Sequence, residues 1–501
     1  MAGFETIQVL RSVLLQCRRP SHRAGRLTRT SLPGIAFIAL LFLTLTRGAS
    51  AVPPPSLAPT KAPTVHNYAM YLKKPSSLGF APDQTYFESM LVRLEQDHVD
   101  HPTTKELYIG VVKEVSALLK DAKISSVKLH ALAINQSLPT DIINLYGDRI
   151  DPHLLWYAMI NGLFLGTGDR FTNFWTPAEY KALNQVMHQS LAGTGMLLGV
   201  EHTTLVVVEV FDGAPAEKAG IRAGDEIVEI NGKTTKGMNP ELAASLIRGK
   251  PGTSVTLTLY RKGGAAKGFS VHVVRARIVV PSVSHRMLPD HIGYMRLRIF
   301  ASHTVTEVRK ALDDLQKHGA RALVIDLRYN PGGYMMDALG ICSMFARPGS
   351  KVLVTVDSSG VHHIVRTTNM EPAFPKIGSG GVSETDLPIV MLVNGYSASA
   401  SEITAGCFQD NHLATLVGEK TFGKGCAQEV LPLPQGAGCK ITVEYFLTPD
   451  GHRVQNRGIE PNVRVAMPLR PLGRQIKDVQ LQKAIQILRS SLAASAKATV
   501  H

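Results

Sequence analysis

Two continuous apolar runs in the C-terminal half constrain the fold of this 501-residue chain more than any other feature. "ALVIDL" spans residues 322–327 and "PIVMLVN" spans residues 388–394. Uninterrupted apolar runs of this length are typical of strands buried on both faces of a sheet. Each run is followed by a turn and a helical pattern, so strands and helices alternate after Ile278. We therefore predict a layered α/β domain over residues 277–470.

Residues 192–276 have a different texture. "TLVVVEVF" (204–211), "DEIVEING" (225–232) and "SVTLTLYRKG" (254–263) are short and rich in β-branched residues. Such segments indicate strands, whereas "NPELAASLIRG" (239–249) indicates one short helix between them. We predict a small β-rich module inserted before the α/β domain.

The region over residues 65–191 is predicted to be mainly helical. Apolar residues recur at helical spacing from Leu107 onward, and "HLLWYAMINGLFLG" (153–166) is an apolar helix ended by glycine. A further helix should start at Thr176, because Pro177 and Glu179 follow it at the first and third helical positions. Residues 471–501 should hold a last helix, at about 478–491, and a tail.

The first 51 residues are predicted to be a targeting segment. Arginines lead into the apolar run 35–45, and "RGASA" ends at Ala51, which is the pattern of a cleaved secretory signal. An uncleaved membrane anchor and a bipartite organelle transit peptide are the alternatives. A proline-rich linker follows at 52–64. The mature chain should therefore work across a membrane from its site of synthesis, in a bacterial periplasm or envelope, or alternatively in a thylakoid lumen.

Composition excludes several classes of function. The net charge of +14 lies partly in the first 51 residues, which hold seven arginines and one acid, and no dense basic run points to nucleic acid. The four cysteines beyond Cys17 form no C-x-x-C pair, so we expect no metal and no cofactor. Buried free thiols are expected, with a Cys426–Cys439 bridge as the alternative. "DHVDHP" (97–102) is interpreted as an exposed helix end rather than a metal site.

A run of three alternating serines raises the question of chemistry. "NGYSASASEITAG" (394–406) places Ser397, Ser399 and Ser401 where a buried strand gives way to a helix. Ser399 and Glu402 have the spacing of a capping box. A serine at a helix N-terminus also lies beside free backbone N–H groups that can stabilise an oxyanion, so a nucleophile fits the same geometry.

A serine nucleophile needs a base, and "GEKTFGKGCAQ" (418–428) contains one candidate, Lys424. Gln428 lies four residues on along a predicted strand, so its side chain should share a face with Lys424 and hold the amine. Burial among small and apolar residues would lower the pKa of the lysine. A solvated turn lysine is the alternative. His412 should lie well away from Ser399, beyond a predicted helix.

Two adjacent glycines complete the candidate site. In "DLRYNPGG" (326–333), Gly332 or Gly333 could present a backbone N–H to a substrate, because glycine allows close approach. Together with the N–H of Ala400, it would form an oxyanion hole. A plain Asn-Pro-Gly-Gly turn is the alternative.

These stretches together resemble the carboxyl-terminal processing peptidases, also called tail-specific proteases. The resemblance covers most of residues 290–465 and includes "VIDLRYNPGGYMMDAL", "VNGYSASASEITAGCFQD" and "VGEKTFGKGCAQ". It implies Ser399 as nucleophile, Lys424 as general base and Gln428 as its positioner, on a ClpP/crotonase-like fold. The oxyanion donors would be Ala400 and a glycine of the pair.

The β-rich module resembles a PDZ domain in "GAPAEKAGIRAGDEIVEINGK" (213–233). PDZ domains bind an extended C-terminal peptide by strand addition, with the terminal carboxylate in a loop of backbone N–H groups. That loop would lie near Gly193, Thr194, Gly195 and Met196. A structural lid is the alternative for this module.

We therefore expect a serine endopeptidase that cleaves protein substrates near apolar or unstructured C-terminal tails. The rival from another class is a catalytically silent PDZ scaffold that binds such tails without cutting them. The sequence indicates no oligomeric state, and membrane association would depend on the N-terminal segment.

Overall fold

The structure is a computed structural model. It describes residues 38–39, 66, 68–187, 190–201, 204–211, 213–236, 238, 243, 246–261, 268–279, 281–367, 387–467 and 478–498. The predicted signal and linker therefore lie almost entirely outside the described residues. Across the described part of the chain, no helix is both long and apolar enough to cross a bilayer.

A six-stranded sheet forms the centre of the C-terminal half. Its order is β11 (Val283–Leu288), β12 (Ile292–Leu297), β13 (Ala322–Asp326), β17 (Ile389–Val393), β18 (Ala414–Gly418) and β21 (Val463–Arg464). Strands β12 to β21 are parallel, and β11 is antiparallel to β12. Every residue of β13 and β17 is buried, as the two apolar runs predict.

Helices cover both faces of this sheet. One core contains side chains of α11 (Thr304–Lys317), α12 (Met335–Phe345) and α13 (Ala400–Asp410), and a second core contains those of α14 (Val479–Ala498). Strand residues alternate between the two cores: Leu323 and Ile325 face the first, Ala322 and Val324 the second. The predicted layered α/β arrangement is therefore present, and α14 extends beyond its predicted end.

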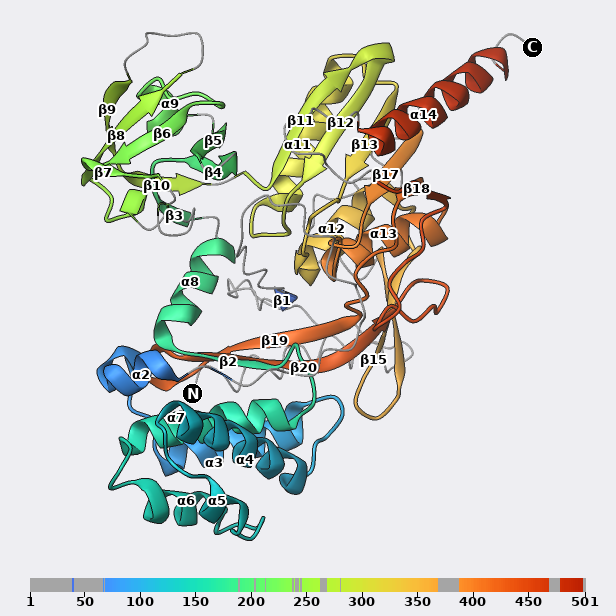
Figure 1. The fold of residues 1–501 in the computed structure, drawn as a ribbon. Coiled ribbons are helices and arrows are strands. Elements are labelled where there is room, and N and C mark those ends of the chain that lie inside the picture. Colours follow the sequence, from blue (N-terminus) through green and yellow to red (C-terminus); the bar gives the residue numbers. More distant parts are fainter. Residues whose placement is uncertain are drawn as a thin grey trace, which may run out of the picture.

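A second sheet makes a long arm. It consists of β16 (His362–Arg366), β15 (Lys351–Val356), β20 (Gly438–Leu447) and β19 (Cys426–Pro432), with β2 (Asn173–Trp175) paired to β20. Figure 1 shows β19 and β20 running between the six-stranded sheet and the N-terminal helices. The arm brings residues near 173 beside residues near 439.

The helical region comprises α2 (Ala69–Lys73), η1 (Pro75–Leu78), α3 (Gln84–Asp97), α4 (Thr104–Asp121), α5 (Val127–His130), α6 (Leu138–Tyr146), α7 (Pro152–Gly166) and α8 (Pro177–Met187). Helix α7 has apolar side chains on every face, and it is therefore almost wholly buried. Its core also includes Leu433, Cys439 and Ile441 from the β19–β20 arm. The helical region and the arm thus share one hydrophobic core.

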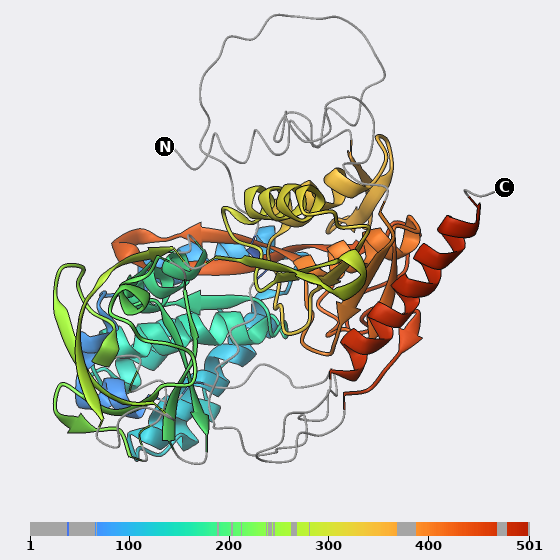
Figure 2. The same ribbon diagram turned by 90° about the horizontal axis from the view of Figure 1, so that it is seen from above.

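The β-rich module has its own core and its own sheet. The sheet order is β4 (Met196–Glu201), β5 (Thr204–Val210), β6 (Glu226–Ile230), β8 (Ser254–Tyr260) and β9 (Phe269–Val274), with β7 (Lys233–Thr234) on β6. A short helix, α9 (Pro215–Lys218), follows β5. The predicted helix at 239–249 lies largely outside the described residues. Figure 1 and Figure 2 place this module and α14 at opposite sides of the molecule.

The remaining short elements lie between or beside these parts. Strands β3 (Ser190–Gly193) and β10 (Ala276–Val279) pair antiparallel where the chain enters and leaves the module. Strand β1 (Ile38–Ala39) pairs with β14 (Gly333–Tyr334). Two 3-10 turns, η2 (Pro289–His291) and η4 (Pro434–Gly436), complete the described elements.

Candidate active site

Ser397 and Ser399 lie in the turn between β17 and α13, Ser401 is the second residue of α13, and all three are fully buried. Ser397 Oγ donates to the carbonyl of Leu327 at 2.8 Å, and Ser401 Oγ donates to the carbonyl of Asn330 at 3.0 Å. Ser399 Oγ has no hydrogen-bond partner within the described part of the chain. Two serines therefore pin the turn to the loop after β13, and the middle hydroxyl is left available.

Ser399 has an unusual backbone conformation. Its φ is +58° and its ψ is −113°, a region that L-residues rarely occupy. Such strain persists only where neighbouring contacts enforce it, and it is concentrated at functional sites. Here Ser399 N–H donates to the Glu402 carboxylate at 2.8 Å, and both Ser397 and Ser401 are anchored. The turn thus presents the Ser399 side chain directly before the first residue of α13.

Glu402 joins the serine turn to the lysine loop. Its carboxylate accepts from the backbone N–H of Ser399, Gly423 and Lys424 and from Thr421 Oγ1, at 2.6 to 2.8 Å. Burial raises the pKa of this carboxyl, and the four hydrogen bonds oppose the rise. The sequence interpretation gave Glu402 a helix-capping role; the structure adds the bonds to the loop that carries Lys424.

Lys424 is fully buried in the loop between β18 and β19. Its Nζ donates to Gln428 Oε1 at 2.8 Å and lies 5.0 Å from the centroid of the Phe171 ring. Burial lowers the pKa of Lys424 below that of an ordinary lysine, because the apolar surroundings disfavour the ammonium form. The predicted contact between Lys424 and Gln428 is therefore present, and the solvated-turn alternative is wrong.

The route to that contact differs from the prediction. β19 begins at Cys426, so Lys424 precedes the strand, and the register shifts between Ala427 and Gln428. The two side chains do not meet through regular strand alternation. The extra residue at the shift, Val443, lies on β20, and the Lys424 amine reaches Gln428 from the loop before β19.

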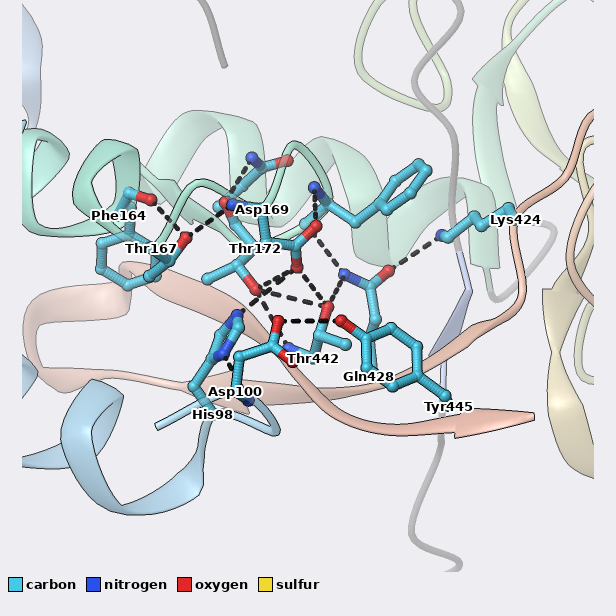
Figure 3. Close-up of polar contacts among 12 residues, drawn as sticks. His98, Asp100, Phe164, Thr167, Asp169, Thr172, Lys424, Gln428, Thr442 and Tyr445 are labelled. Atoms are coloured by element: carbon cyan, nitrogen blue, oxygen red, sulfur yellow. Dashed lines mark hydrogen bonds and ion pairs between the residues drawn. The ribbon is translucent and has the colours of Figure 1, made fainter. Parts of the chain in front are cut away.

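Gln428 is itself held on its far side. Its Nε2 donates to the carbonyl of Phe171 at 2.5 Å and to Thr442 Oγ1 at 3.3 Å. Phe171 belongs to the segment between α7 and β2, and Thr442 to β20. Figure 3 shows the amide placed between Thr442 and the Lys424 amine.

The glycine pair lies against the serine turn. A Cβ added to Gly332 would lie 2.7 Å from the carbonyl oxygen of Ala398, 2.9 Å from Ser399 Cβ and 3.0 Å from Ala400 N. A Cβ on Gly333 would lie 1.8 Å from the carbonyl oxygen of Phe300. Gly332 N–H donates to Asn330 Oδ1 at 2.9 Å, so its hydrogen already has a partner. The two glycines are present because no other residue fits this contact.

The predicted carboxylate loop joins β3 to β4. Thr194 is buried, and its carbonyl accepts from Ala216 N at 2.8 Å. Gly195 has a φ of +80°, and its carbonyl accepts from Phe211 N at 3.0 Å. The predicted residues Gly193 and Met196 end β3 and begin β4. The loop is therefore packed against the start of α9.

The structure also shows where the other residues singled out in the sequence lie. His412 is exposed beyond the far end of α13, as expected. All four described cysteines are buried and free, so the Cys426–Cys439 bridge is absent. Among the described residues, no cluster of three His, Cys, Asp or Glu side chains could hold a metal ion.

The interpretation of residues 97–102 as an exposed helix end is wrong for its first histidine. α3 ends at Asp97, and His98 is completely buried, with Nε2 3.6 Å from Asp169 Oδ2. Sequence reasoning missed both residues. A signal for Asp169 is its place in "INGLFLGTGDRFTNFWTPAEY" (160–180), a segment whose sequence also resembles, more loosely, the carboxyl-terminal processing peptidases.

Comparisons with known proteins agree with this architecture. Residues 291–465 match peptidase family S41, and residues 206–261 match the PDZ domain. A carboxyl-terminal-processing protease of Picosynechococcus is 36% identical over 341 residues, which cover 66% of this chain and 78% of the relative. Carboxyl-terminal-processing peptidase 3, chloroplastic, of Arabidopsis thaliana is 32% identical over 321 residues, which cover 62% and 60%.

Among solved structures, a photosystem II D1 C-terminal processing protease matches with 26% identity and a TM-score of 0.40, over 73% of this chain and 93% of that one. The α/β domain and the β-rich module therefore define a serine-type peptidase that carries a PDZ domain. The chain belongs to the carboxyl-terminal processing proteases of peptidase family S41.

Proposed function

We propose that this chain is an endopeptidase in which Ser399 is the nucleophile, Lys424 the general base and Gln428 the residue that positions the base. One observation carries the proposal: a fully buried lysine amine is held by Gln428 in a loop that Glu402 ties to the Ser399 N–H. Burying a lysine amine is unfavourable for stability. A lysine buried in this way therefore indicates a functional site that uses the neutral amine.

In the proposed reaction, the neutral Lys424 amine takes the proton of Ser399 Oγ as the oxygen attacks the scissile carbonyl carbon. The resulting ammonium gives that proton to the leaving amine, and an acyl-enzyme ester remains. Water, deprotonated by the same lysine, then attacks the ester and releases the new C-terminus with Ser399 restored. Gln428 keeps the lysine side chain oriented through both steps.

We further propose that the oxyanion is held by the N–H groups of Ala400 and Gly333. Ala400 is the first residue of α13, where backbone N–H groups lack intrahelical partners. Gly332 N–H donates to Asn330, whereas Gly333 pairs with Ala39 of β1, so a substrate would have to displace β1 to reach the Gly333 N–H. Two such donors stabilise the tetrahedral intermediate, which carries the negative charge.

Substrate recognition is assigned to the PDZ domain, with the terminal carboxylate of an apolar tail near residues 193–196. The division of the chain at 65–191, 192–276 and 277–470 is supported by separate cores in the β-rich module and the α/β domain. A ClpP/crotonase-like relationship of the α/β domain is supported by its helix-covered parallel sheet. An extracytoplasmic location rests on the leader sequence and on relatives from bacteria and a chloroplast.

The test compares cleavage by the full chain and by variants. A folded protein with an apolar C-terminal tail is incubated with the parent, Ser399→Ala and Lys424→Ala. Matched controls are Ser359→Ala, at an exposed serine, and Lys420→Ala, at an exposed lysine that pairs with Glu460. Cleavage should fall by about 10³-fold or more in the first two variants and stay unchanged in the controls.

Two outcomes would contradict the proposal. Cleavage that survives Ser399→Ala would remove this residue as nucleophile. A parent chain that binds the tail, for example in an anisotropy titration, and never cuts it would favour the silent PDZ scaffold.

A further inference from the structure

A carboxylate from the helical region lies behind the candidate dyad. Asp169 is in the loop between α7 and β2, and its side chain is 12% exposed. Its Oδ2 accepts from Thr172 Oγ1 at 2.8 Å and from Thr442 Oγ1 at 2.5 Å, while Oδ1 accepts from the Phe171 N–H at 2.9 Å. Figure 3 shows these bonds converging on the carboxylate.

Two of the residues that bind Asp169, Phe171 and Thr442, also hold Gln428. The Gln428 amide donates to the Phe171 carbonyl and to Thr442 Oγ1. A hydroxyl has one hydrogen, and a carboxylate can only accept, so Thr442 must donate toward Asp169. Its lone pairs then face the Gln428 amide. This direction keeps the Gln428 carbonyl, rather than its NH₂ group, turned to Lys424.

A buried histidine supports the carboxylate from the other side. His98 Nδ1 accepts from the Asp100 N–H at 3.2 Å, so the ring proton lies on Nε2, which faces Asp169 Oδ2 at 3.6 Å. The next residue, Val99, donates its N–H to the carbonyl of Thr442 at 2.8 Å. The end of α3 is therefore joined to both Asp169 and the strand that carries Thr442.

We propose that Asp169, backed by His98, is a positioning residue of the proteolytic site that fixes the Gln428 amide through Thr442 and Phe171, and thereby the Lys424 amine. This inference rests on the proposed function of the dyad. It makes the helical region part of the catalytic apparatus, because His98 and Asp169 come from that region and Lys424 and Gln428 from the α/β domain.

The charge of Asp169 gives the proposal a distinctive signature. The ionisable groups that act on the Lys424 amine are Cys426, Asp169, Glu402, Arg170 and Lys440, and Tyr445 is a further ionisable group near Asp169. Burial opposes ionisation of Asp169, but hydrogen bonds from Thr442, Phe171 and Thr172 and the nearby His98 ring lower its pKa, so it is negative at neutral pH. A negative Asp169 favours the Lys424 ammonium and so raises the pKa of that lysine.

Loss of the Asp169 charge should change the pKa of Lys424 in one direction. Replacing Asp169 by neutral asparagine lowers the pKa of Lys424, so the free amine forms at lower pH. The acidic limb of the pH–rate profile should then move to lower pH. Thr442→Val keeps the charge and removes the hydroxyl, so it should lower kcat without moving that limb.

The experiment measures kcat, KM and the pH profile of the full chain for Asp169→Asn and Thr442→Val. Asp100→Asn is the matched control, because this exposed carboxylate contacts Tyr445 on the same strand and does not touch Gln428. We expect kcat to fall by about tenfold or more in both test variants with KM unchanged. The limb should shift only in Asp169→Asn, and Asp100→Asn should match the parent.

Two results would overturn the proposal. In the first, both variants keep the parental kcat. In the second, Asp169→Asn loses activity and thermal stability while the acidic limb of its pH–rate profile stays in place. Should Asp169→Asn fail to fold, Thr442→Val decides: a loss of kcat at parental melting temperature supports the proposal, and parental kcat overturns it. Failure of the proposed function would look different, since the parent would then show no cleavage that depends on Ser399.

Discussion

At the scale of single residues, the proposed function makes the buried amine of Lys424 the group that sets the pH dependence of cleavage. The side chain makes a 2.8 Å bond to Gln428 and has a pKa below its ordinary value because of burial. An ordinary lysine, with a pKa of about 10.4, would be protonated at neutral pH and could not take a proton from serine. Burial therefore gives Lys424 the lowered pKa that a general base needs and that an ordinary lysine lacks.

Arg170 offers a test of this assignment with a definite sign. Its guanidinium lies over the rings of Phe171 and Phe422, at 4.6 and 5.2 Å, and its positive charge lowers the pKa of Lys424. In Arg170→Gln that pKa should rise, so the acidic limb of kcat/KM should move to higher pH. Lys420→Gln, at an exposed cation, is the control. A limb that stays in place or moves to lower pH would argue against Lys424 as the base.

Sequence reasoning identified the candidate dyad but not its support. Three serines at alternating positions could not be separated by local pattern, and the family pattern selected Ser399. The hydrogen bonds of Ser397 and Ser401 to the loop after β13 depend on tertiary packing, so no local signal shows them. His98 was misinterpreted for the same reason, since its partner Asp169 lies in another segment of the helical region.

At the scale of elements, the Asn-Pro-Gly-Gly turn makes a close contact with the start of α13, beside the proposed nucleophile Ser399. Gly332 has a φ of +97° and no room for a Cβ beside Ser399 and Ala400. The contact holds two loops at the ends of neighbouring parallel strands. Any added atom there must displace the serine turn.

Gly332→Ala should therefore lose activity through displacement of Ser399. Gly349→Ala is the matched control, because Gly349 also has a positive φ of +83° but nothing within 4 Å of an added Cβ. Both variants should lose about 1 kcal/mol of unfolding free energy from backbone strain. Only Gly332→Ala should also lose kcat, by about tenfold or more. Equal kcat in the two variants would contradict the close-contact explanation.

The elements themselves were largely predictable. Continuous apolar runs predicted β13 and β17, and the Thr-Pro-x-Glu pattern predicted the start of α8, where Thr176 N–H and Oγ1 both donate to Glu179. The position of Lys424 outside a strand was not predictable. β19 begins only at Cys426, where pairing with β20 starts, and that pairing is a tertiary contact that local sequence does not show.

At the scale of the whole molecule, the shared core of the helical region and the β19–β20 arm is the feature that sequence could not indicate. Phe174 on β2 lies in this core and contacts the rings of Phe80, Tyr86, Tyr157 and Phe164. It follows the Phe171–Thr172 segment, which contacts Gln428 and Thr442. Packing of the helices is thereby connected to the orientation of Gln428.

Phe174→Ala should lower both stability and activity. Removing a buried aromatic side chain costs about 3 to 5 kcal/mol of unfolding free energy, and loosening β2 should reduce kcat more than it changes KM. Phe269→Ala, at a 36% exposed phenylalanine on β9 of the PDZ domain, is the size-matched control. Thermal melts and steady-state kinetics on the same preparations measure both effects. Parental kcat in a destabilised Phe174→Ala variant would show that core and site are independent.

The long separation between partners also determines when the enzyme can become active. Gln428 and the Phe171 carbonyl that holds it are 257 residues apart. Ribosomes extend the chain from its N-terminus, so the helices emerge long before the arm that completes their core and carries Gln428. A nascent chain therefore holds no assembled base, and a chain kept unfolded for transport across a membrane holds none either. Completion of folding itself would act as the activation step and protect the compartment of synthesis from proteolysis.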